Sequence, residues 1–176
     1  MFDYNRYDKA LGHAQKWLSK SELIVSKTDL KGTITYANPA FLRIANYTTQ
    51  ELVGKPHNII RHPDMPRAIF HLMWEQLQKG LSVHAYVKNL TKEGDFYWTF
   101  AYVVPDLDAK GNVIGYHSER RAPNQKALLD IEPLYEKLKN LEIAYDIPTA
   151  VAHLETHVTQ KASHYEAYLF QLQNQA

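Results

Sequence analysis

Four consecutive residues, Arg61, His62, Pro63 and Asp64, bring together a fixed cation, a titratable imidazole and a carboxylate. Pro63 and the nearby Pro66 stiffen the loop that carries these groups. A set of this kind can hold a pyrophosphate and adjust the charge around a bound ring. The same groups can also satisfy one another, with Asp64 capping the following helix and Arg61 paired to it. The spacing alone favours neither interpretation.

Other side chains suited to binding occur singly, and each has a structural alternative. Trp74 lies on the apolar face of an expected helix, where it is either a core indole or the wall of a flat ligand site. Asn38 has the type and position of a helix N-cap. Asn89 needs a hydrogen-bond partner if its strand register turns it inward. Tyr97 and Trp98 point to opposite faces of one strand, so at most one of them can contact a ligand.

The nine histidines raise the question of a metal or haem site. His153 and His157 are four residues apart on an expected helix, and His164 follows seven residues later, a spacing that can hold a divalent ion. No HExxH-type glutamate accompanies them, so exposed helical histidines are the favoured interpretation. For haem, His57 in a loop and His71 in a helix are the candidate axial ligands.

The overall composition narrows the classes of function. With 176 residues the chain is long enough for one domain and some added elements. A net charge of +1 argues against nucleic acid or a membrane surface as partner. The lack of cysteine excludes disulfides, thiolate metal sites and cysteine nucleophiles, and no catalytic residue set is readable, so we expect no enzyme. No apolar run suits a secretion signal or a membrane span, which predicts a cytoplasmic protein without membrane insertion.

The order of hydrophobic patterns predicts an α+β fold. Five β-prone runs are grouped around a helical segment instead of alternating with helices, which indicates a five-stranded antiparallel sheet. The expected strands are Leu23–Ser26, Thr33–Tyr36, Ser82–Leu90, Phe96–Pro105 and Val113–Arg120. Short helical pieces are expected between residues 38 and 62, with Thr49 as a cap, followed by one longer helix over Pro66–Lys79.

Helices are also expected at both ends of the chain. Tyr7–Lys20 has the spacing of an amphipathic cap helix, and Lys126–Glu142 that of a helix interrupted at Pro133. Thr149–Gln173 carries apolar residues three and four apart, which could form the seam of a homodimer. The chain is therefore divided into an N-terminal cap, 1–21, a central domain, 22–122, and a C-terminal helical extension, 123–176.

One string is more specific than the order of elements. Residues 54–66, GKPHNIIRHPDMP, strongly resemble the PAS domain of bacterial aerotaxis receptors. The resemblance covers about residues 22–121 and departs from the family pattern mainly in the last strand, 117–121, and in the C-terminal helices. It continues after the string through Trp74, Val87–Asn89, Gly94–Trp98 and Gly115–Tyr116.

The resemblance implies a PAS fold and a redox or oxygen sensor that holds a flavin. FAD is the expected flavin and FMN the second choice. The sensor is expected to pass its redox state to a signalling partner such as a chemoreceptor. Two alternatives on the same scaffold are a haem-binding gas sensor and a cofactor-free module for dimerisation. The lack of cysteine excludes a light-driven cysteinyl–flavin adduct. The positions that match the family's flavin-associated residues are Asn38, Arg61, His62, Asp64, Trp74 and Asn89. Tyr97 is added to this set as the residue of its strand that is expected to face the ligand.

Overall fold

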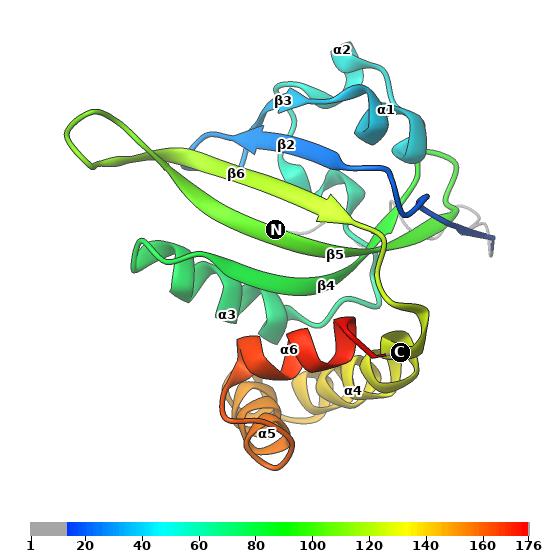
Figure 1. Ribbon diagram of the computed structural model, residues 1–176, viewed down its shortest axis with the longest axis vertical. Helices are drawn as coiled ribbons and strands as arrows, with labels where there is room; N and C mark the ends of the chain where they lie inside the picture. The colour runs from blue at the N-terminus through cyan, green and yellow to red at the C-terminus, as the bar shows by residue number, and fades with distance from the viewer. Residues whose placement is uncertain (1–13, 176) are drawn as a thin grey trace.

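The computed structural model describes residues 14–175 (Figure 1). A twisted six-stranded sheet occupies the upper part of this view, and three C-terminal helices lie beneath it. The predicted α+β order of elements, with strands before and after a helical segment, is confirmed. Within the described range, no helix is long and apolar enough to cross a membrane.

Five strands of the sheet are antiparallel, in the order β4–β5–β6–β2–β3, and a short sixth strand, β1, runs parallel to the start of β5. Gly115 is required in β6 because a Cβ atom there would collide with the carbonyl oxygen of Thr28 in β2. The five predicted strands are present, and their ends move by no more than two residues. The strands are β1(Gln15–Lys16), β2(Ile24–Thr28), β3(Ile34–Ala37), β4(Val83–Leu90), β5(Phe96–Leu107) and β6(Val113–Arg121).

The predicted helix over Tyr7–Lys20 is wrong where the structure describes it, because β1 lies there instead. The backbone N–H of Phe96 donates to the carbonyl of Ala14 at 3.1 Å. β6 pairs with β5 only from Phe100 onward, so the start of β5 has a free edge that β1 occupies. The part of this prediction over residues 7–13 lies outside the described residues.

Four helical segments connect the two groups of strands: α1(Pro39–Ala45), α2(Thr49–Leu52), a 3₁₀ helix (His57–Ile60) and α3(Arg67–Gln78). The cap of α2 is Thr48, one residue before the expected Thr49, and its N–H donates to the Glu51 carboxylate at 2.9 Å. α3 buries Ile69, Met73 and Leu77 in the core. The helix predicted over Pro66–Lys79 is therefore confirmed to within one residue at each end.

The first C-terminal helix, α4(Gln125–Ala144), continues through Pro133, so the expected interruption is wrong. The N–H that a proline lacks would have bonded to the carbonyl of Leu129, four residues earlier. Both Leu129 and Pro133 have exposed side chains, so water can reach that carbonyl. The exposed position therefore tolerates a proline that a buried helix face would not.

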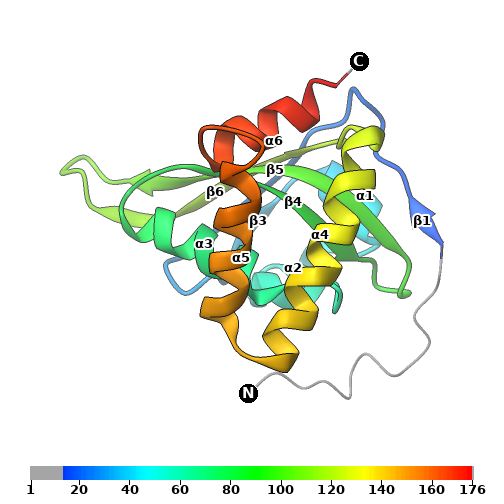
Figure 2. The same ribbon diagram turned by 90° about the horizontal axis from the view of Figure 1, so that it is seen from below.

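The expected single helix over Thr149–Gln173 is two helices, α5(Ile147–Thr159) and α6(Tyr165–Gln173). The break allows α5 to pack on α3 and α4 while α6 packs on β4 (Figure 2). The apolar residues of the expected dimer seam are consequently used within the chain. Those that are buried here include Leu154, Val158, Leu169 and Leu172.

Candidate functional site

A cavity of about 350 Å³ lies between α3, the 3₁₀ helix and one face of the sheet. This volume falls in the range of about 300–1,000 Å³ that is typical of small-molecule sites. Alternate residues of β2, β4 and β6 face it, because the strand period of two sends the intervening residues to the opposite face. β5 contributes Val103. α3 contributes an apolar and aromatic wall, and β6 contributes Tyr116, Ser118 and Arg120 to the polar lining.

The polar end of the cavity is built around Arg120, which is buried with 7% of its surface exposed. Its Nη1 donates to Nε2 of His57 at 3.1 Å, and the hydroxyl of Ser26 lies at the same distance from that nitrogen. Among residues 14–175, the Nε of Arg120 and the buried hydroxyl of Ser118 find no hydrogen-bond partner. No ion pair to a carboxylate offsets the charge of Arg120 within the described residues, so the cavity contains a buried cation with unused donors.

Burial governs the ionisation of this end of the cavity. It lowers the pKa of His57 to about 3, with the nearby positive charge of Arg120 acting in the same direction. His57 is therefore neutral at physiological pH, and its Nε2 can accept the hydrogen bond from Arg120. Burial also lowers the pKa of Arg120 to about 10, which still leaves the guanidinium protonated at neutral pH.

The aromatic wall consists of Trp74, Tyr116 and Phe70. Trp74 and Tyr116 meet edge to face with ring centroids 5.2 Å apart, and Trp74 is 40% exposed, so it is a wall residue and not a core indole. Gly32, at φ +80°, brings its backbone close to the Trp74 ring. The guanidinium carbon of Arg61 lies 4.0 Å from the centroid of Phe70, which places a second cation at the cavity.

Asn89 faces the cavity from β4 and is 2% exposed. Its side-chain nitrogen donates to the carbonyl of Val87 at 3.1 Å and approaches the hydroxyl of Thr99 at 3.4 Å. A backbone bridge also joins Asn89 to Arg61. The structure thus brings together three of the predicted site residues, Arg61, Trp74 and Asn89.

His62 and Asp64 lie outside the cavity. The Nδ1 of His62 accepts the backbone N–H of Asp64 at 3.0 Å, and burial, together with Lys88, lowers the pKa of His62 to about 4. The carboxylate of Asp64 pairs with Lys88 of β4 at 2.8 Å and with Lys139 of α4 at 3.4 Å. Asp64 neither caps α3 nor pairs with Arg61, because lysines from two other elements reach its carboxylate.

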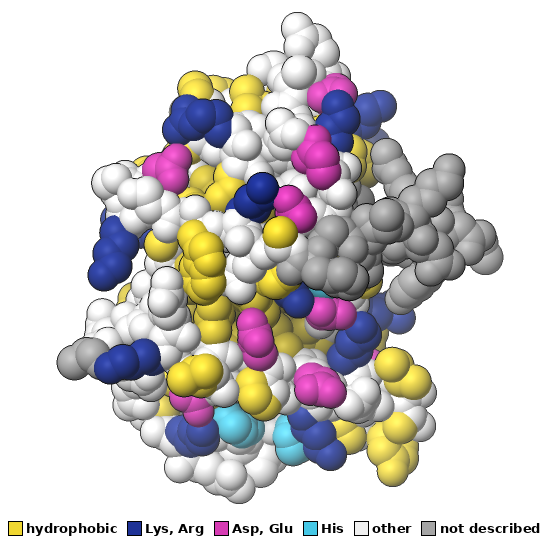
Figure 3. Space-filling view, turned by 90° about the vertical axis from the view of Figure 1, so that its right-hand side faces the viewer, with side chains coloured by type: hydrophobic (Ala, Val, Ile, Leu, Met, Phe, Trp, Pro, Cys, Tyr) yellow, Lys and Arg dark blue, Asp and Glu magenta, His cyan; other side chains and the backbone are white. Residues whose placement is uncertain are grey.

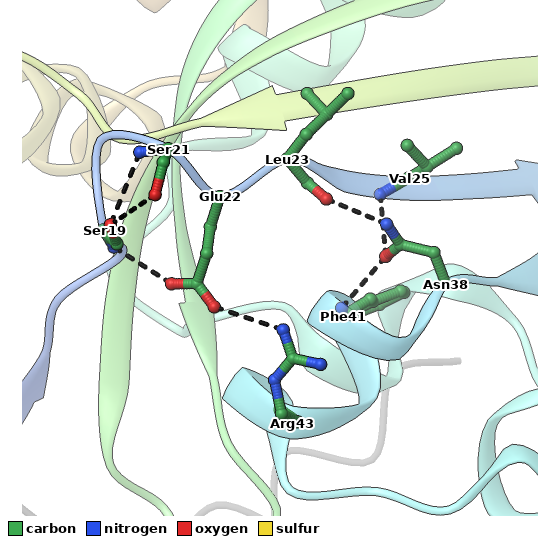
Figure 4. A network of polar contacts seen from close by, with 8 residues as sticks. All are labelled: Ser19, Ser21, Glu22, Leu23, Val25, Asn38, Phe41 and Arg43. Carbon is green, nitrogen blue, oxygen red and sulfur yellow. Dashed lines mark hydrogen bonds and ion pairs between the residues drawn. The ribbon is translucent and has the colours of Figure 1, made fainter.

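Asn38 and Tyr97 also lie away from the cavity lining. The Asn38 amide donates to the carbonyl of Leu23 at 2.8 Å and accepts the N–H groups of Val25 and Phe41, as Figure 4 shows. Asn38 is therefore a helix cap that also holds β2. Tyr97 is buried in the core cluster around Phe41 and its hydroxyl has no partner, whereas the next residue points to the opposite face as expected.

Four lining residues were not predicted from the sequence: Arg120, Ser118, Ser26 and Tyr116. The period of two in β6 carried a usable signal, because Tyr116, Ser118 and Arg120 alternate and must share a face. His57, a candidate haem ligand by residue type, lies in the string 54–66 and lines the cavity beside Arg120 and Ser26.

Features that would indicate other classes of site are weak in the described residues. No cluster of three or more His, Cys, Asp or Glu side chains there could hold a metal ion. His153 and His157 are on α5, whereas His164 precedes α6, so the break separates them. On the face shown in Figure 3, basic and acidic side chains are interspersed and form no extended patch of one sign.

Comparison with known proteins gives matches of two kinds. Residues 34–118 match the family model described as PAS fold. The aerotaxis receptor of Escherichia coli K12 is 44% identical over 121 residues, which are 69% of this chain and 24% of the receptor. The nitrogen fixation regulatory protein of Klebsiella pneumoniae is 25% identical over 124 residues, which are 64% of this chain and 25% of the regulator. The chain thus spans about a quarter of the length of each of these relatives.

Solved structures of light–oxygen–voltage domains share the fold. The dark structure of the blue-light photoreceptor Aureochrome1 superposes with a TM-score of 0.54 at 23% identity, covering 68% of this chain and 86% of that one. A light–oxygen–voltage domain studied with a flavin analogue gives a TM-score of 0.53 at 20% identity, covering 68% of this chain and 87% of that one.

Proposed function

Residues 34–118 belong to the PAS family, and we propose that this domain is a flavin-binding redox or oxygen sensor in signal transduction, with FAD as its cofactor. The observation that carries the proposal is the buried, unpaired cation Arg120 at the polar end of a cavity whose other wall is aromatic. The similarity to an aerotaxis receptor supports a signalling role.

The residues of the cavity fit the two ends of a flavin ring. Arg120 and Ser118 offer donors to the carbonyl and nitrogen edge of the ring, and unused donors in a buried site call for an acceptor. Asn89 places its side-chain amide at the same cavity. Trp74 and the apolar side chains of α3 would contact the ring face and its hydrocarbon edge. When bound, the flavin supplies reversible electron uptake, and the side chains around it hold and orient it.

The preference for FAD over FMN rests on two cations that line the cavity. Arg61 and Lys31 both line it, and cations there suit a phosphate or pyrophosphate. The haem alternative is less well supported, because His71 does not line the cavity and Nε2 of His57 is engaged by Arg120 and Ser26. The cofactor-free alternative predicts a pocket filled by its own side chains, and the volume of about 350 Å³ argues against it.

The proposed sensor role also suggests a binding partner and a cellular location. We expect the sensor to act in the cytoplasm on a signalling protein such as a membrane chemoreceptor. The three C-terminal helices are packed on α3 and β4, so they are part of the sensor's own fold.

Purification followed by release and chromatography of the chromophore tests this function. A flavin absorption spectrum that bleaches with dithionite, and FAD in the released fraction, are the expected results. FMN in that fraction would correct the choice of cofactor. A Soret band, or a protein that takes up no added flavin, would contradict the proposed function.

A further inference from the structure

One continuous segment, residues 61–78, forms a wall of the cavity. Arg61 starts it, and α3 continues it with Phe70, Met73 and Trp74 facing the same space. Because packed helices shift as units and do not deform smoothly, a ligand that presses on this wall acts on the whole of α3. The contacts at the start of the segment therefore decide where such a shift is transmitted.

The first contact is an ion pair across the outside of the loop. Asp64 turns away from the cavity and receives Lys88 of β4 at 2.8 Å and Lys139 of α4 at 3.4 Å. Lys139 therefore connects a loop that lines the cavity to a helix that does not.

The second contact lies one turn further along α4. Pro66 precedes α3 and has no side-chain acceptor, so α3 lacks an N-cap of its own. Glu142 takes over this role from a distance of 75 residues, and its carboxylate accepts the N–H groups of Arg67 at 3.0 Å and Ala68 at 2.6 Å. A negative charge at this helix end is also favoured by the helix dipole.

The middle of α4 is fixed on the other face of the sheet. The hydroxyl of Tyr135 donates to the carbonyl of Tyr86 in β4 at 2.8 Å, and Leu134 and Leu138 are buried. The last turn of α4 is thus attached to the cavity wall, while the preceding turns are attached to the sheet.

We propose that Lys139 and Glu142 form a latch through which the C-terminal helices sense flavin binding in the cavity. This proposal rests on the proposed function, because flavin is the ligand whose binding the latch would transmit to α4. Bound flavin moves or immobilises the wall formed by residues 61–78. The contacts of Lys139 with Asp64 and of Glu142 with the first turn of α3 then tighten. As a result, the end of α4 becomes more ordered. Since coupling between two sites is reciprocal, loss of the latch must change flavin affinity by the same factor as flavin changes the latch.

Hydrogen exchange on the full chain, with and without bound FAD, tests the latch. Glu142→Ala and Lys139→Ala remove it, and Glu142→Gln keeps an acceptor oxygen. Glu136→Ala and Lys137→Ala are matched controls on exposed positions of the same helix. In the parent, FAD should slow exchange in the first turn of α3 and the last turn of α4. Glu142→Ala should speed exchange in α3 by roughly 2- to 30-fold, the range for loss of an N-cap.

The decisive observation is the effect of FAD in the variants. The latch predicts that in Glu142→Ala FAD still slows hydrogen exchange in β4 and β6 but no longer slows it in the last turn of α4. Glu142→Gln should show intermediate protection of that turn. Both control variants should show the same protection as the parent. If FAD protects the last turn of α4 equally in parent and Glu142→Ala, or in neither, the latch is wrong although FAD binds. If the parent binds no FAD, the proposed function fails first, and the latch fails with it.

Discussion

The two faces of the sheet formed by β4, β5 and β6 bury polar groups in different ways. On the outer face, covered by the C-terminal helices, His84 meets Glu166 at 2.6 Å and the hydroxyl of Tyr86 donates to Gln173 at 2.9 Å. On the cavity face the sheet leaves space, and the Nε of Arg120 and the hydroxyl of Ser118 have no partner in the part of the chain that the structure describes. The indole N–H of Trp98 and the hydroxyl of Tyr165 are exceptions on the outer side.

This difference indicates that the outer face mainly determines the stability of the fold, whereas the cavity face mainly determines ligand binding. Ring contacts such as Trp98 with Tyr135 fill the outer face, so substitutions there should mainly change the free energy of unfolding. Polar groups on the cavity face are costly to bury and gain a partner only from a ligand. Substitutions there should mainly change ligand retention.

The largest expected effect is on the outer face. Trp98→Ala should lower the free energy of unfolding by roughly 3–5 kcal/mol, because a buried indole is replaced by a void. Denaturant titration of the flavin-free protein measures this change, with Leu129→Ala, at a position 78% exposed, as the control that should change little. A loss below about 1 kcal/mol would mean that the C-terminal helices do not seal this face.

The next effect is a loss of stability in acid. His57 and His62 have folded-state pKa values of about 3 and about 4, below the ordinary value of 6.5, so unfolding takes up protons below pH 6.5. Stability should therefore fall as the pH is lowered from 7 to 5, by roughly 2–4 kcal/mol for the two histidines together. Unfolding at the two pH values measures it, and the double variant His57→Gln, His62→Gln should flatten the dependence. An equally steep dependence in that variant would rule out these histidines as its source.

A smaller stability effect is expected at the cavity wall. Trp74→Ala should cost less than about 2 kcal/mol, because the side chain is only partly buried, yet it should weaken flavin retention by removing the aromatic wall. Flavin absorbance per protein after gel filtration, together with denaturant titration, separates the two quantities. Full retention of flavin in a folded Trp74→Ala protein would remove Trp74 from the site.

Periodicity predicted the elements that local sequence determines. The five strands and α3 are in place because alternation and the 3.6-residue spacing coincide with their burial. β1 could not be predicted, since it depends on the free edge of a strand 81 residues away, where Gln15 pairs with Phe96. The candidate site shows the same limit. Arg61, Trp74 and Asn89 line the cavity, but Asn38 and Asp64 are engaged by distant partners, Leu23 and Lys139. His62 is engaged by the backbone N–H of Asp64. Arg120 could have been predicted, because it alternates with Ser118 and Tyr116 along β6 and therefore shares their face.

The most direct test of binding on the cavity face is the flavin dissociation constant of Arg120→Met. Methionine keeps the length of the side chain and removes the buried charge and its donors. We predict FAD affinity roughly 10- to 150-fold weaker, the loss of one charge-assisted hydrogen bond. The flavin-free variant should be as stable as the parent or more stable, by up to about 4 kcal/mol, since an unpaired buried cation is lost. Unchanged FAD affinity in a folded Arg120→Met protein would contradict the assignment of this cavity as the flavin site.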